Sequence, residues 1–134
     1  MYKEMLPSGE EARRLGYSQG VRVNNLLLIS GQVALDEKGE IVGKGDFKTQ
    51  ARKVFQNLKS VVERAGGQLE DVVKITVYIT DIRYLEEFRK IRGEYFKEWF
   101  PASTLVEVGA LIKSGLMLEI DAIAVIREST KASI

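Results

Sequence analysis

The chain of 134 residues contains no cysteine and no histidine, and only two prolines. The lack of cysteine excludes disulfides, thiolate chemistry and cysteine zinc sites. The lack of histidine excludes Ser-His and Cys-His nucleophiles, the commonest metal ligand and the usual proton shuttle at neutral pH. We therefore expect no metal site and no cofactor. Any catalysis must use carboxylates, hydroxyls, arginine, backbone groups and water.

The sequence also lacks a strong net charge and a long hydrophobic run. Its 20 basic and 19 acidic residues give a net charge of +1, which supplies no field to attract a polyanion, so no nucleic-acid partner is expected. No segment approaches the ~20 apolar residues that span a membrane, and the N-terminus carries acids. We predict a cytoplasmic protein without a membrane partner, folded as one domain over residues 1–134.

The first third of the chain has the pattern of two hairpins. Residues 17–35 predict two strands around Asn24-Asn25, a pair that tolerates the positive φ of a tight turn. The run 26–29 is apolar on both faces, which is typical of a central strand covered on both sides and ending at Ser30-Gly31. A second turn at 36–39 predicts a short return strand at 41–42.

Two helices and one strand follow. Apolar residues spaced by three and four predict a helix that Asp46 caps and that Gly66-Gly67 ends. Residues 71–80 alternate strictly and predict a strand whose core face holds Val73, Ile75, Val77 and Ile79. A second helix is predicted from Asp81 to Phe100-Pro101. Its apolar stripe is Leu85, Phe88, Ile91, Tyr95, Phe96 and Trp99, and Arg92 lies at the edge of that stripe.

The C-terminal stretch predicts two long strands, 103–112 and 116–127, joined by a turn at 113–115. In the first, we expect the face with Val106 to lie under the helices and the face with Ser103, Leu105 and Glu107 to be half-polar. In the second, Glu119 lies opposite an apolar face, which is formed by Leu116, Leu118, Ile120, Ala122, Ala124 and Ile126. The prediction is an α+β fold in which two helices cover one face of a mixed sheet. The half-polar face then contacts water or another subunit.

Five segments in this order resemble the Rid/YjgF family. They are GYSQG at 16–20, ISGQV at 29–33, VVKITVYITDI at 72–82, FPASTLVEV at 100–108 and LEIDAIA at 118–124. The resemblance implies a chorismate-mutase-like fold with a mixed six-stranded sheet and two helices packed on one face. It also implies a homotrimer with three clefts between subunits, each of which binds a small-molecule metabolite.

Active members of the family hydrolyse imine and enamine acids, such as 2-iminobutanoate and 2-aminoacrylate, to keto acids and ammonia. The resemblance places Tyr17, Ser30 and the backbone of Gly31 in the cleft, and makes Glu119 the carboxylate that orients or deprotonates the attacking water. Three positions depart from the pattern: Ser103 stands where deaminating members have a carboxylate-binding arginine, Leu105 where many have cysteine, and Arg92 where asparagine is frequent. A serine does not replace a bidentate arginine.

Each of these residues also has a structural interpretation. Glu119 is either a general base with a raised pKa or a carboxylate paired with a Lys or Arg across an interface. Tyr17 can be a packed aromatic, and Ser30-Gly31 a simple strand end. We hypothesise that Arg92 supplies the positive charge that is missing at Ser103. The alternative is a salt bridge from Arg92 to Glu107, to Glu119 or to an acid of a neighbouring subunit.

Three functions therefore compete. The first is a trimeric protein that binds small carbonyl or carboxylate metabolites and hydrolyses 2-imino acids. The second is a non-catalytic metabolite-binding or interaction protein of the same fold, which Ser103 favours. The third is an endoribonuclease or translation inhibitor, against which the near-zero net charge and the lack of histidine both argue.

Overall fold

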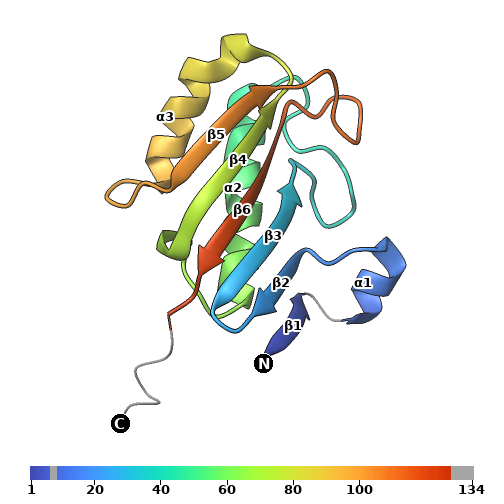
Figure 1. The fold of residues 1–134 in the computed structure, drawn as a ribbon. Coiled ribbons are helices and arrows are strands. Elements are labelled where there is room, and N and C mark those ends of the chain that lie inside the picture. The colour runs from blue at the N-terminus through green and yellow to red at the C-terminus, as the bar shows by residue number, and fades with distance from the viewer. Residues whose placement is uncertain (7–8, 128–134) are drawn as a thin grey trace.

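Six strands form one mixed sheet, and two long helices cover one of its faces (Figure 1). The computed structural model describes residues 1–6 and 9–127. The elements in chain order are β1 (Lys3–Leu6), α1 (Gly9–Leu15), β2 (Gly20–Val23), β3 (Leu26–Gln32), α2 (Phe47–Arg64), η1 (Leu69–Asp71), β4 (Val72–Ile79), η2 (Ile82–Tyr84), α3 (Leu85–Tyr95), β5 (Ala102–Glu107) and β6 (Leu118–Val125). The sheet order is β1-β2-β3-β6-β4-β5, in which β4 and β5 are parallel and the other pairs antiparallel. The predicted α+β class is confirmed.

Helix α2 begins and ends where the sequence predicts. The Asp46 side chain accepts a hydrogen bond from the backbone N–H of Thr49, and Gly66 adopts a φ of +89° just beyond the helix. The buried stripe of α2 packs on the core faces of β3 and β6. The predicted core face of β6 is confirmed, as is that of β4 except for Val73, which a register shift turns outward.

The fully buried Gln50 of α2 anchors the segment before β6. Its amide nitrogen donates to the carbonyls of Gly43 and Gly115, at 3.2 and 2.9 Å, and its amide oxygen accepts from the N–H of Met117 at 2.9 Å. These bonds satisfy a polar side chain inside the core. They fix residues 115–117 against α2, which sets where β6 begins.

The predicted hairpin of the last two strands is wrong. Strand β5 ends at Glu107, and β4 separates it from β6 in the sheet. Because β4, α3 and β5 form a strand-helix-strand unit, β5 instead lies parallel to β4.

The predicted facing of β5 is also reversed. Ser103 and Leu105 lie beside Ile75 and Val77 of β4, which point toward the helices, whereas Val106 lies on the uncovered face and is 40% exposed. The alternation in β5 is correct, but the pairing with β4 decides which face is covered.

Strand β3 is not covered on both sides within one chain. Leu26 and Leu28 are 39% and 44% exposed on the face that carries no helix. The strand also continues past Ser30-Gly31 to Gln32, with an irregularity in its pairing with β6 between Ile29 and Gln32. The predicted return strand at 41–42 is reduced to a single bridge between Ile41 and Leu35.

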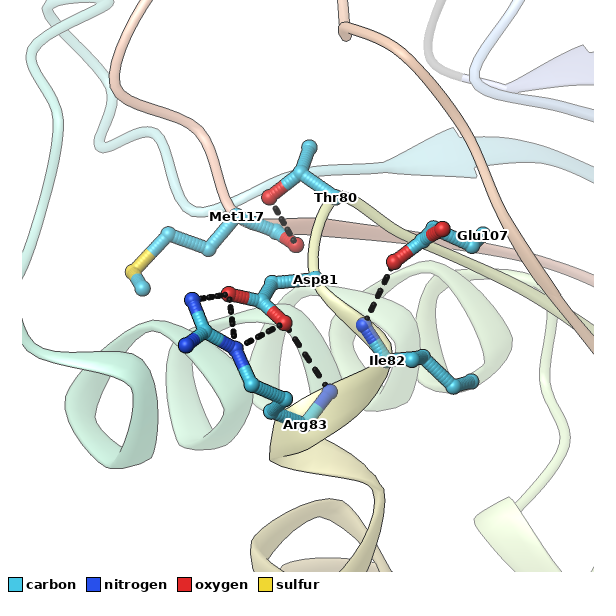
Figure 2. Close-up of polar contacts among 6 residues, drawn as sticks. All are labelled: Thr80, Asp81, Ile82, Arg83, Glu107 and Met117. Carbon is cyan, nitrogen blue, oxygen red and sulfur yellow. Dashed lines mark hydrogen bonds and ion pairs between the residues drawn. The ribbon is translucent and has the colours of Figure 1, made fainter.

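The second helix is shorter than predicted. A 3-10 turn precedes α3, whose last residue is Tyr95, so Trp99 lies outside the helix and is 49% exposed. Figure 2 shows the turn: Asp81 accepts hydrogen bonds from Arg83, and the carboxylate of Glu107 accepts from the N–H of Ile82. These contacts tie the end of β5 to the start of the turn.

Strand β1 and helix α1 were not predicted. Strand β1 is a four-residue edge strand, and the carboxamide oxygen of Asn24 accepts from the N–H of Tyr2 beside it. The predicted turn at Asn24 is confirmed, with a φ of 55°. Within residues 1–6 and 9–127, no helix is long and apolar enough to cross a membrane.

Candidate active site

The predicted site residues form two groups on opposite faces of the sheet. We call Tyr17, Ser30, Gly31 and Glu119 the Glu119 half-site, and Arg92 with Ser103 the Arg92 half-site. Glu119 lies beside Tyr78 of β4 on the uncovered face, whereas Ser103 lies beside Ile75 on the helix-covered face. One chain therefore does not bring its own two groups into a single cleft.

In the Glu119 half-site, the side chain of Glu119 packs directly on Gly31. A Cβ atom on Gly31 would lie 2.6 Å from the carboxyl carbon of Glu119, well inside van der Waals contact. The irregularity in β3 brings this glycine against the carboxylate, as bulges near functional sites often do. Glycine is therefore required here for close approach.

Ser30 fixes the strand beside the carboxylate. Its hydroxyl donates to the carbonyl of Ser18 at 2.6 Å, which ties β3 to the segment that carries Tyr17. Tyr17, which precedes Ser18 in the chain, is 49% exposed. The alternative of a packed aromatic does not hold within one chain.

Gln32 supports the same strand and was not singled out from the sequence. It is buried, and its amide nitrogen donates to the carbonyl of Ser30 and to the side-chain oxygen of Gln19. Its place in the ISGQV segment was the available signal. The side chain shapes the backbone that holds Gly31.

Burial raises the pKa of Glu119 above its ordinary value, and the nearby carboxylate of Asp121 raises it further. Asp121 in turn accepts a hydrogen bond from the Tyr78 hydroxyl at 2.9 Å, an interaction that raises the pKa of Tyr78. Within the described residues Glu119 has no ion pair. A partly desolvated carboxylate with a raised pKa is suited to accept and return a proton.

In the Arg92 half-site, the guanidinium of Arg92 lies 3.4 Å from the Ser103 hydroxyl and stacks on the ring of Phe88, 5.4 Å from its centroid. Burial lowers the pKa of Arg92, and the charge of Arg89 lowers it further. Neither Glu107 nor Glu119 forms an ion pair with Arg92. Because no carboxylate of the described chain reaches it, Arg92 is a charged group without a charged partner.

A pocket of ≈ 320 Å³ opens at this half-site, between α3 and the start of β5. Ser103 and Arg92 line it together with Arg89, Phe96, Phe100 and Pro101. Leu105 lies farther along β5, partly buried against the core on the same face. Arg89 was not singled out from the sequence as a site residue, although its spacing of three from Arg92 was the available signal.

The family model described as Endoribonuclease L-PSP matches residues 10–126 of the chain. A RutC family protein of Pyrococcus abyssi is 41% identical over 126 residues, which are 92% of this chain and 98% of the relative. A protein of Dermatophagoides farinae named 2-iminobutanoate/2-iminopropanoate deaminase is 34% identical over 110 residues, covering 82% of this chain and 85% of that protein.

The fold is similar to solved structures of the same group. The crystal structure of RidA from an Antarctic Psychrobacter superposes with a TM-score of 0.77 at 40% identity, covering 82% of this chain and 88% of that one. The mixed sheet with its helices thus agrees with the predicted YjgF-type architecture.

Proposed function

Because the chain belongs to the Rid/YjgF family, we propose that it is a homotrimer whose intersubunit clefts bind small carboxylate metabolites and hydrolyse 2-imino acids to 2-keto acids and ammonia. The observation that carries this proposal is the separation of the two half-sites. Glu119 and Arg92 lie on opposite faces of one sheet, so a second copy is needed to complete a cleft. The named deaminase among the relatives supports the choice of reaction.

The uncovered sheet face supports assembly. Leu26, Leu28 and Val125 are between 39% and 45% exposed on that face, and Val106, farther across the sheet on β5, is 40% exposed. Exposed apolar residues gathered on one face mark an interaction surface in soluble proteins. A second and third copy would bury this face and bring a neighbour's Arg92 half-site toward Glu119. Light scattering at micromolar concentration should give the mass of three chains, and a monomer would contradict the assembly.

The chemistry divides between the two half-sites. The guanidinium of Arg92 pairs with the carboxylate of the imino acid through charge-assisted hydrogen bonds, and the Ser103 hydroxyl adds one more. The Glu119 carboxylate orients a water and takes its proton as the oxygen attacks the imine carbon. The imine nitrogen is protonated when the water attacks, so the product is a neutral carbinolamine. Glu119 returns the proton to its nitrogen, the C–N bond breaks to release ammonia, and the hydroxyl proton passes to Glu119 as the C=O bond of the keto acid forms. A raised Glu119 pKa suits both steps.

The reaction can be tested by measuring ammonia release from 2-iminobutanoate that a dehydratase generates in situ. We expect Glu119→Gln to lower the acceleration by about 100-fold or more, because general-base catalysis contributes on that order. Arg92→Met should raise KM, since it removes the group that binds the carboxylate. Lys90→Met is the matched control, because Lys90 is an exposed cation of the same helix that does not line the pocket.

Binding without turnover is the alternative function, and Ser103 is the observation that favours it. A hydroxyl 3.4 Å from Arg92 does not hold a carboxylate as a bidentate arginine does. If the wild type binds 2-ketobutyrate but does not accelerate imine hydrolysis, this alternative replaces the deaminase. RNA cleavage has weaker support, because the chain lacks histidine and carries a net charge of only +1.

A further inference from the structure

The pocket of the Arg92 half-site contains two guanidinium groups but only one is needed for a monocarboxylate. Arg89 and Arg92 are three residues apart on α3, so their side chains emerge from one face of the helix and line the same pocket. Among the residues that the structure describes, no aspartate or glutamate lines this pocket. Within one chain, two like charges therefore face one small volume whose walls contain no carboxylate.

Arg89 lies close enough to Arg92 for its positive charge to act on that group. The charge of Arg89 lowers the pKa of Arg92, in addition to the effect of burial. A ligand with a single negative charge relieves only part of this repulsion, whereas a ligand with two compensates both groups. The charge of this pocket is therefore complementary to a dianion.

The ion pair that Arg89 forms with Glu86 does not prevent Arg89 from binding a ligand in the pocket. One nitrogen of Arg89 lies 2.7 Å from Glu86, a carboxylate outside the pocket, and both side chains of this pair are more than half exposed. Exposed ion pairs contribute little to stability, and a guanidinium has five N–H donors. Arg89 can therefore keep this contact or exchange it while it donates to a ligand.

The apolar residues that line the rest of the pocket favour a ligand in which a carbon chain joins the two negative charges. Phe96, Phe100 and Pro101 line the pocket beside the two arginines and the Ser103 hydroxyl. Apolar walls with a few polar groups fix the orientation of small organic ligands. The planar fork of arginine matches a carboxylate through two parallel hydrogen bonds.

We propose that this pocket selects small dicarboxylates over monocarboxylates, with Arg92 binding one carboxylate and Arg89 the other. The inference rests on the proposed function in one respect, the binding of a substrate carboxylate by Arg92. It narrows the substrate class to 2-imino and 2-keto acids that carry a second acidic group.

The test compares the dissociation constants of succinate, butyrate and inorganic phosphate by calorimetry on the full chain, at one ionic strength. Succinate and butyrate both have a four-carbon chain but differ by one charge. We expect succinate to bind at least about tenfold more tightly than butyrate, because a second charge-assisted pair forms. Arg89→Met should abolish this preference, because it should weaken succinate binding much more than butyrate binding. Arg92→Met should weaken both ligands, and Lys90→Met neither.

Equal affinities for succinate and butyrate, or an unchanged ratio in Arg89→Met, would overturn the proposal. Phosphate binding more tightly than succinate would also overturn it, since the pocket would then be a general anion site. These outcomes are separate from turnover. If the protein prefers succinate but releases no ammonia, the dicarboxylate proposal holds and the deaminase proposal fails. If it releases ammonia but binds succinate and butyrate equally, the deaminase proposal holds and the dicarboxylate proposal fails.

Discussion

Replacing Gly31 by alanine should remove activity while leaving the fold intact. The added Cβ would lie 2.6 Å from the carboxyl carbon of Glu119, so the carboxylate must move by about 1 Å to restore van der Waals separation. A displacement of that size at a reacting group costs about 100-fold in rate. The backbone of Gly31 is not in the left-handed region, and the displaced group is the end of a flexible side chain. We therefore expect the free energy of unfolding to change by less than about 1 kcal/mol.

The assay is ammonia release from 2-iminobutanoate, with urea unfolding measured on the same preparations. Gly109→Ala is the control, because no atom lies within 4 Å of the methyl group it would add. It should retain wild-type turnover. If Gly31→Ala also turned over within twofold of the wild type, the position of the Glu119 carboxylate against Gly31 would be irrelevant to the chemistry and the reasoning would be refuted.

Two further predictions concern stability. Gln50→Leu should lower the free energy of unfolding by about 3 kcal/mol in urea titrations, because the Met117 N–H and the Gly115 carbonyl lose their hydrogen-bond partners. Gln56→Leu, at an exposed position of the same helix, should change the free energy of unfolding little. An equal effect of both variants would contradict the role of Gln50 in anchoring residues 115–117. Glu119 has a folded pKa raised by burial and by Asp121, so its stabilising contribution is complete below the unfolded pKa and is lost as pH rises through the folded value. Glu119→Gln should therefore be more stable than the wild type at pH 7 and equal to it at a pH well below the ordinary Glu pKa. Urea unfolding at both pH values measures this difference in stability. A difference of the same size at both pH values would disprove the raised pKa.

The sequence predicts α2 and β6 well because their patterns are local. Helix α2 has a cap at one end, a glycine at the other and an apolar stripe between them, and all three appear in the structure. The position of Arg92 at the edge of the α3 stripe follows from the same periodicity. Where the spacing of residues within one helix or strand determines which face is buried, the sequence alone is sufficient to predict that face.

The errors concern pairings between distant segments. Both faces of β5 mix apolar and polar residues, so alternation does not tell which face the helices cover. The order strand, helix, strand from β4 to β5 is typical of a parallel crossover and was the signal that could have corrected the hairpin.

The contact between Gly31 and Glu119 depends on an irregularity in the pairing of β3 with β6. No pattern within residues 29–33 specifies that irregularity, because it arises from the register with a strand almost ninety residues away. The family resemblance, rather than any local pattern, brought these two residues into one predicted site. Their contact within one chain emerges only from the folded sheet.

The most direct test of the account is complementation between two impaired variants, assayed at a substrate concentration far below the KM of either. Glu119→Ala keeps Arg92, and Arg92→Met keeps Glu119, so each variant alone should lack complete clefts. When equal amounts are unfolded in urea and refolded together, random assembly of a cyclic trimer should restore about one quarter of the clefts. We predict recovery of about a quarter of the ammonia release of identically refolded wild type. Activity no greater than the sum of the two parents would contradict a cleft shared between subunits.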